Sequence, residues 1–274
     1  MNLLRFFFLL IPTFFLAQIS YEGKIGDYPV EMVLNVDDNS TSGIYMYSKF
    51  NQPISITGKF ENKNLVLFES EGKFKTGKFI FENFEDSKDK YFGTWTNLKT
   101  KSQLNVSLKK KENQKSFLQI ASIKQFYFRG IQEDDQSYLL IINKKDNQIF
   151  QKMKMEECGF DGIYDVSVDD YNFDGYEDFS SCTQSYAGPN TSKTYFLFDE
   201  KKNQFFASDF YGTSLEFDPQ KKEIIETNQC CAGESIIKNI YKVDKNQMKL
   251  IKAHCYKWSE KLQRHVEKKP KDCE

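Results

Sequence analysis

This chain of 274 residues has few histidines, few long apolar runs and almost no net charge. The two histidines, His254 and His265, lie near the C-terminus, and their spacing with Cys255 matches no common zinc pattern. The 38 basic residues are balanced by 39 acidic residues, whereas a nucleic-acid-binding protein is expected to carry a strongly basic face. These shortages argue against a zinc site and against a nucleic-acid partner.

Short catalytic motifs are also missing. The sequence has no Gly-x-Ser-x-Gly elbow and no glycine-rich loop that would bind phosphate. Glu133, Asp134 and Asp135 are adjacent acids, but consecutive residues point in opposite directions in a strand and are solvated in a loop, so they do not form an acid pair for glycoside cleavage. We therefore predict a protein that is not an enzyme.

A single apolar run opens the chain. Arg5 precedes the apolar residues 6–17, and polar sequence begins at Gln18, which is the pattern of a secretory signal peptide. The run is too short for an ordinary membrane span, and no second run exists. No cysteine lies beside the expected cleavage point to carry a lipid. We expect residues 1–17 to be removed, which leaves a periplasmic or secreted protein without a membrane span.

Cysteine is absent from the N-terminal part of the chain. The six cysteines are Cys158, Cys182, Cys230, Cys231, Cys255 and Cys273. An even number in an exported chain predicts disulfides. We expect a bridge between Cys158 and Cys182, and we expect the adjacent Cys230 and Cys231 to pair with different partners. The alternative is that some of these cysteines remain reduced and buried.

Residues 18–109 contain short alternating apolar runs at intervals of about ten residues, bounded by glycine, asparagine, aspartate or proline. No helical period of useful length appears. The high aromatic content, 16% of all residues, also favours pleated structure. Evenly spaced strands predict an up-and-down β-meander that closes into a small barrel or a sandwich.

Charged residues 110–116 predict a solvated linker to a second domain, residues 117–274. This domain contains a weak repeat of an apolar strand, a polar turn with Asn-Gln and a return strand. The copies span residues 140–150, 196–206 and 243–248. Repeated hairpins predict a propeller-like or otherwise meandering antiparallel sheet. The predicted fold class is therefore all-β throughout.

One stretch of the second domain specifies a chemistry. Residues 170–178 follow the pattern D-x-N-x-D-G-x-x-D, which places oxygen-bearing side chains at alternate positions around a sharp glycine turn. Hard oxygen ligands of this kind suit Ca²⁺. The predicted ligands are the side chains of Asp170, Asn172, Asp174 and Asp178 and the backbone carbonyl of Tyr176.

The flanks of this calcium loop favour strands over helices. A helical EF-hand needs a bidentate glutamate at its last position, where this chain has Ser181. The preceding residues 163–168 are β-branched and alternating, so we predict a strand, a loop and a second strand. The alternative is a plain Asp-Gly hairpin turn without a metal.

The loop resembles the calcium loops of the FG-GAP class, found in integrin-like β-propellers. Together with residues 195–199 and Cys230-Cys231-Ala232-Gly233, it also resembles a group of exported bacterial proteins. Some members of that group are periplasmic, calcium-binding immunity proteins that block peptidoglycan-cleaving toxins. The resemblance covers about residues 130–255, and the N-terminal meander is loosely similar to small β-barrels that inhibit lysozyme.

Two classes of function follow. The resemblance implies a calcium-binding module that binds another protein. The implied partner is a peptidoglycan hydrolase, which the module inhibits. The alternative is an envelope carbohydrate-binding or adhesion module, because tyrosines and Trp95 can stack on sugars.

Overall fold

The computed structural model describes residues 18–36, 40–85, 88–155, 162–186 and 188–273. In these ranges the chain is all-β, with strands β1 to β21 and two short 3₁₀ turns, η1 (Cys231–Gly233) and η2 (Pro270–Asp272). The predicted signal peptide, residues 1–17, lies outside the described residues. Within them, no helix has the length and apolar character needed to cross a membrane.

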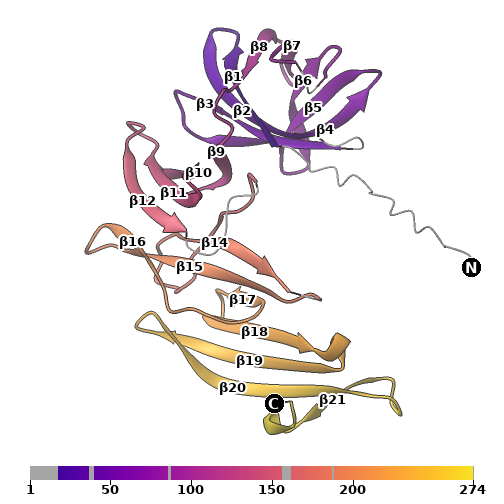
Figure 1. The fold of residues 1–274 in the computed structure, drawn as a ribbon, viewed down its shortest axis with the longest axis vertical. Coiled ribbons are helices and arrows are strands. Elements are labelled where there is room, and N and C mark those ends of the chain that lie inside the picture. The colour runs from indigo at the N-terminus through magenta and orange to yellow at the C-terminus, as the bar shows by residue number, and fades with distance from the viewer. Residues whose placement is uncertain (1–17, 37–39, 86–87, 156–161, 187, 274) are drawn as a thin grey trace, which may run out of the picture.

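The N-terminal strands form a closed barrel (Figure 1). Each strand pairs antiparallel with the next, and β1 pairs with β8 to close the sheet. Its inward side chains, including the fully buried Tyr21, Leu67 and Phe79, fill the interior. The strands are β1 (Gln18–Ile25), β2 (Tyr28–Val36), β3 (Thr41–Tyr47), β4 (Pro53–Glu61), β5 (Asn64–Glu71), β6 (Phe74–Phe81), β7 (Lys90–Asn97) and β8 (Gln103–Lys110). Of the two predicted architectures, the barrel is confirmed.

The remaining strands form three antiparallel meanders. The first sheet contains β9 (Ser116–Ser122), β10 (Phe126–Glu133), β11 (Gln136–Asn143) and β12 (Ile149–Met155). The second contains β13 (Ser167–Asp169), β14 (Asp178–Ser185), β15 (Thr191–Asp199) and β16 (Gln204–Ala207). The third contains β17 (Leu215–Asp218), β18 (Glu223–Cys230), β19 (Ser235–Asp244), β20 (Gln247–Ser259) and β21 (Arg264–Lys268). The barrel and the three sheets follow one another along the long axis of Figure 1.

The three sequence repeats are hairpins, as predicted. They connect β11 to β12, β15 to β16 and β19 to β20. In each hairpin the asparagine of the Asn-Gln pair has a positive φ: 62° at Asn147, 50° at Asn203 and 60° at Asn246. Asparagine adopts this left-handed conformation more readily than most residues do. The sequence repeat therefore arises from the residues that the three hairpin turns require.

Apolar clusters join each unit to the next. Val33, Ile44 and Met46 on the outside of the barrel pack with Leu118 and Tyr127 of the first sheet. Another cluster joins the first sheet to the second and includes Phe128, Phe179 and Phe205. A third joins the second sheet to the third and includes Tyr195, Leu197 and Ile224. Packing therefore runs in sequence from the barrel to the C-terminal sheet.

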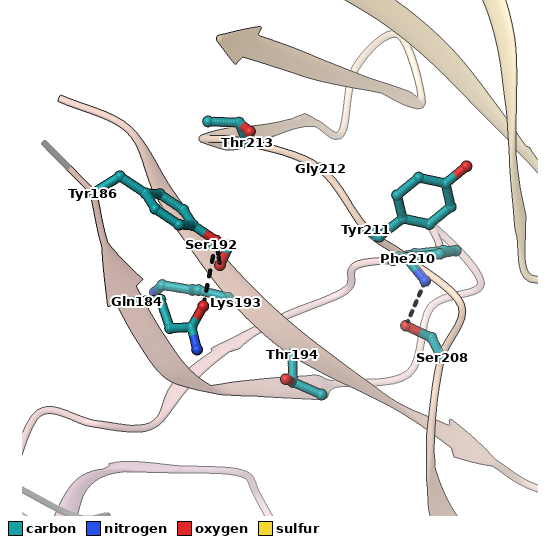
Figure 2. Close-up of a pocket in the computed structure, with 10 residues that line it drawn as sticks. All are labelled: Gln184, Tyr186, Ser192, Lys193, Thr194, Ser208, Phe210, Tyr211, Gly212 and Thr213. Atoms are coloured by element: carbon teal, nitrogen blue, oxygen red, sulfur yellow. Dashed lines mark hydrogen bonds between the residues drawn. The ribbon is translucent and has the colours of Figure 1, made fainter. Parts of the chain in front are cut away.

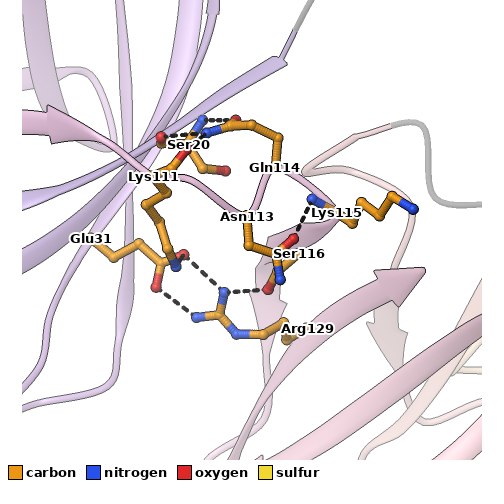
Figure 3. Close-up of polar contacts among 8 residues, drawn as sticks. All are labelled: Ser20, Glu31, Lys111, Asn113, Gln114, Lys115, Ser116 and Arg129. Atoms are coloured by element: carbon orange, nitrogen blue, oxygen red, sulfur yellow. Dashed lines mark hydrogen bonds and ion pairs between the residues drawn. The ribbon is translucent and has the colours of Figure 1, made fainter. Parts of the chain in front are cut away.

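The charged stretch after β8 is more ordered than its composition suggests (Figure 3). The backbone N–H of Lys111 donates to the carbonyl of Ser20 at 2.9 Å. The Gln114 amide also donates to that carbonyl at 3.1 Å and accepts from the Ser20 backbone N–H at 2.9 Å. The predicted solvated linker is thus held against strand β1.

An ion pair crosses the joint between the barrel and the first sheet (Figure 3). The guanidinium of Arg129, on β10, donates two hydrogen bonds of 2.8 and 2.7 Å to the carboxylate of Glu31, on β2. Lys111 lies 3.2 Å from the same carboxylate, and all three side chains are mostly buried. Burial alone would raise the pKa of Glu31, but hydrogen bonds and charge from Arg129 and Lys111 outweigh it and lower that pKa.

We predict that Glu31→Gln destabilises the protein by about 3–5 kcal/mol, because it leaves the Arg129 charge buried without a counter-charge. Urea unfolding at neutral pH measures the effect. The matched control is Glu22→Gln, since Glu22 lies opposite Glu31 in the β1–β2 register but is exposed. Equal stability of the two variants would contradict the assignment.

The same pair sets a pH dependence. Because the folded-state pKa of Glu31 lies below its ordinary value of 4.5, its contribution is complete above that pH and is lost as pH falls through the folded-state value. Glu31→Gln should remove this part of the acid sensitivity.

Candidate functional site

The predicted calcium loop connects β13 to β14, which pair antiparallel with Asp169 opposite Asp178. The predicted arrangement of a strand, a loop and a strand is therefore confirmed. The first strand is shorter than predicted, because only Ser167–Asp169 is extended, and Ile163 and Val166 are buried in the turns before it. Gly175 turns the chain with φ 97°, a backbone conformation that residues other than glycine rarely adopt.

Three of the predicted ligands converge at the rim of the loop. Oδ1 of Asp170 and Oδ1 of Asn172 both accept the backbone N–H of Asp174, at 3.0 and 3.1 Å. The Asn172 amide also donates to the Asp174 carboxylate at 2.8 Å. The Asp174 carboxylate in turn accepts the backbone N–H of Tyr176 at 2.9 Å. These contacts gather oxygen atoms on the inside of the turn.

Asp178 lies at the base of the loop and is fully buried. Its two carboxylate oxygens accept the backbone N–H groups of Tyr171, at 3.0 Å, and Phe198, at 2.9 Å. Burial raises the pKa of Asp178 to about 7, and the negative charges of Asp174 and Asp170 act in the same direction, against the two backbone hydrogen bonds. A bound cation would stabilise the charged form of this carboxylate.

The donor set fits calcium in its chemistry. All the predicted ligands are oxygens, and a carboxylate oxygen that accepts one hydrogen bond keeps a second lone pair. Across the described residues, however, no group of three or more histidine, cysteine, aspartate or glutamate side chains is gathered closely enough to hold a metal ion. Asp170, Asp174 and Asp178 are therefore not gathered into one carboxylate cluster, and the oxygens that converge at the rim are those of Asp170, Asn172 and Asp174.

The loop is also the joint between the second and third sheets. Asn172 donates from its amide to Asn246 Oδ1, in the β19–β20 hairpin, at 3.0 Å. Lys222, before β18, donates to the carbonyl of Phe173 at 3.2 Å. The rings of Tyr171 and Phe217 lie 4.7 Å apart. Asn246 belongs to the third sequence repeat, but nothing in the sequence linked that repeat to the loop.

The cysteines follow the expectation only in part. Cys255 and Cys273 form a disulfide that ties η2 to β20. Cys230 and Cys231 are both free and exposed, so the expectation that they pair with different partners is wrong. They are adjacent at the end of β18, where Cys231 has a positive φ of 58°. The expected bridge between Cys158 and Cys182 lies outside the described residues, because Cys158 is not described.

The two histidines lie on the neighbouring strands β20 and β21. Nδ1 of His254 is 2.6 Å from a Glu267 carboxylate oxygen, and Nε2 of His265 donates to the Gly233 carbonyl at 2.7 Å. The three adjacent acids, Glu133 to Asp135, lie at the β10–β11 turn, where Asp134 and Asp135 have positive φ.

A surface cleft of about 490 Å³ lies on the second sheet (Figure 2). The sequence did not predict it. Ser192, Lys193 and Thr194 of β15 line it, together with the segment from Ser208 to Thr213. Lys193 is half-buried, which lowers its pKa, and its amine donates to Ser167 Oγ at 3.1 Å. Tyr211 is 82% exposed at the rim, where its ring offers a flat apolar surface.

Comparison with known proteins identifies no relative: no protein-family model matches the chain, and no curated protein matches its sequence.

We predict that Ca²⁺ raises the melting temperature of the wild-type chain relative to EGTA. When the Ca²⁺ concentration is ten times the dissociation constant, binding stabilises the folded state by ~1.4 kcal/mol. For a chain of this size, each kcal/mol of stabilisation raises the melting temperature by about 2–4 °C. Asp174→Ala should lose this rise, because it removes a ligand carboxylate. Scanning calorimetry or thermal circular dichroism measures it.

The matched control is Asp146→Ala. Asp146 is exposed in the β11–β12 turn, where its carboxylate accepts the N–H of Gln148 at 3.1 Å, as Asp174 accepts that of Tyr176. Asp146→Ala should keep the full calcium response. Identical wild-type melting curves in calcium and in EGTA would rule out the metal.

Proposed function

We propose that this chain is an exported, calcium-stabilised β protein that acts by binding another protein, and that its partner is a peptidoglycan-cleaving enzyme that it inhibits. The proposal rests on the position of the D-x-N-x-D-G-x-x-D loop, whose rim contacts both the second and the third sheet. An ion held there would fix the relative orientation of two sheets. A rigid surface loses less conformational entropy when a partner binds.

The architecture agrees with a binding role. Each C-terminal sheet is a meander of four or five strands, the strand order of a propeller blade, and the predicted calcium loop lies between the first two strands of the second sheet. The N-terminal domain is a closed eight-stranded barrel, the architecture expected from its loose similarity to lysozyme-inhibiting barrels. Export is proposed from the signal-like residues 1–17.

A second candidate function follows from the cleft on the second sheet (Figure 2). Its walls carry hydroxyl groups from Ser192, Thr194 and Ser208, and the exposed ring of Tyr211 lies at its rim. Hydroxyls that hydrogen-bond and an aromatic face that stacks are the groups that bind sugars. This cleft favours the carbohydrate-binding module as the alternative.

We predict that the mature chain, residues 18–274, inhibits a peptidoglycan hydrolase when the two are present in about equal amounts. The assay measures the turbidity loss of purified peptidoglycan with lysozyme-type and amidase-type enzymes, with a pull-down of the same enzymes by the immobilised chain. Inhibition should weaken in EGTA and in Asp174→Ala, while Asp146→Ala should inhibit like the wild type.

The outcomes separate the candidates. Glycan binding without inhibition, lost in Tyr211→Ala but kept in Tyr164→Ala, would favour the carbohydrate module, because Tyr164 is also exposed but does not line the cleft. Cleavage of peptidoglycan by the chain alone would contradict both.

A further inference from the structure

A buried carboxylate lies inside one end of the barrel. Glu69, on β5, follows Leu67 on the inward face and is only 8% exposed. Its Oε1 accepts two hydrogen bonds, from the Tyr45 hydroxyl at 2.6 Å and from the Trp95 indole N–H at 2.5 Å. A carboxyl oxygen has two lone pairs, so Oε1 can accept both of these hydrogen bonds.

The backbone leaves room for this carboxylate. Gly77, opposite Glu69 in the β5–β6 register, is the neighbour that makes the space. A Cβ built on Gly77 would lie 2.4 Å from Oε2 of Glu69, closer than atoms tolerate. Glycine is therefore required at position 77 if Glu69 is to keep its inward orientation.

Among the described residues, no lysine, arginine or histidine forms an ion pair with Glu69. Glu31, which is buried to a similar degree, is paired with both Arg129 and Lys111. Buried charges in proteins are normally paired, so Glu69 lacks a partner that its environment calls for.

Aromatic rings lead from Glu69 to the solvent. Tyr45 contacts Tyr47 with ring centres 5.4 Å apart, and Tyr47 contacts Tyr28 at 6.2 Å and Phe50 at 6.3 Å. Tyr28 and Phe50 are more than half exposed and lie at the β1–β2 and β3–β4 hairpins, which define this end of the barrel. Burial raises the pKa of Tyr47, and the negative charge of Glu69 adds to the shift. At this end of the barrel, its mouth, aromatic side chains therefore lie between the Glu69 carboxyl group and the exposed hairpins.

We propose that this mouth binds an organic cation, an alkylammonium or guanidinium group, with Glu69 as the counter-charge. Aromatic faces attract such cations, most strongly where water is excluded, and the mouths of β-barrels are common ligand sites. A calcium ion fits poorly, because it takes six to eight oxygen ligands, and Glu69 is the one buried carboxylate among the described residues of the barrel interior. The site is separate from the calcium loop and does not depend on the proposed function.

Trp95 supplies a direct readout. The chain has two tryptophans, and the other, Trp258, lies in the third sheet, so Trp258→Phe leaves a single reporter that touches Glu69. In this background we expect n-butylammonium and n-butylguanidinium to change the Trp95 fluorescence saturably, whereas n-butanol should not. This comparison uses one folded protein throughout.

Glu69→Gln tests the charge itself. Glutamine keeps an oxygen for Tyr45 and Trp95 but removes the negative charge, so affinity for both cations should fall at least about tenfold. The matched control is Glu71→Gln, since Glu71 lies two residues along β5 but is exposed. Tyr47→Leu should also weaken binding by removing an aromatic wall, and circular dichroism verifies that each variant is folded.

Blocked Gly-Lys-Gly and Gly-Arg-Gly peptides identify the source of the cation. Tighter binding of the peptides than of the butyl cations would assign the mouth to a side chain of a polypeptide, and the reverse order would assign it to a free amine. Either order supports the site. Equal responses to n-butanol and n-butylammonium, or unchanged affinity in Glu69→Gln, would overturn it.

Discussion

The constraint that shapes this molecule is that no unit covers all of its own apolar surface. The barrel is filled inside, yet Val33 and Ile44 face outward and need the first sheet. Meanders of four or five strands likewise need a layer against their apolar face. Each sheet is therefore stabilised by its neighbours, and the order of the units along the chain becomes their order in space (Figure 1).

Apolar surfaces alone do not fix how two layers are placed, and each joint also contains a directional polar contact. At the first joint it is the pair of Glu31 and Arg129. At the second, the Gln151 amide donates to the Phe205 carbonyl at 2.8 Å and accepts its N–H at 2.9 Å. At the third it is the hydrogen bond from Asn172 to Asn246. The predicted calcium loop thus lies at the last of the three joints.

Local patterns in the sequence were enough for the strands and hairpins, because alternation and turn asparagines act within a few residues. The β-meander of residues 18–109 and the repeated hairpins followed directly from them. Closure of the barrel depends on the pairing of β1 with β8, far apart in the chain, and alternation alone could not separate it from a sandwich. The contacts of Gln114 and Asn246 were missed for the same reason, since their partners are distant in sequence.

Three buried carboxylates show why the sequence alone predicts so little about where ligands bind. Glu31 is neutralised by Arg129, Asp178 accepts from the N–H groups of Tyr171 and Phe198, and Glu69 accepts from Tyr45 and Trp95. A full positive charge compensates a buried anion, whereas dipoles of N–H and O–H groups do so in part. Asp178 and Glu69 have no ion-pair partner among the described residues, and the proposed ligands are the groups that would supply a cation there: a metal ion at the loop and an organic cation at the barrel mouth.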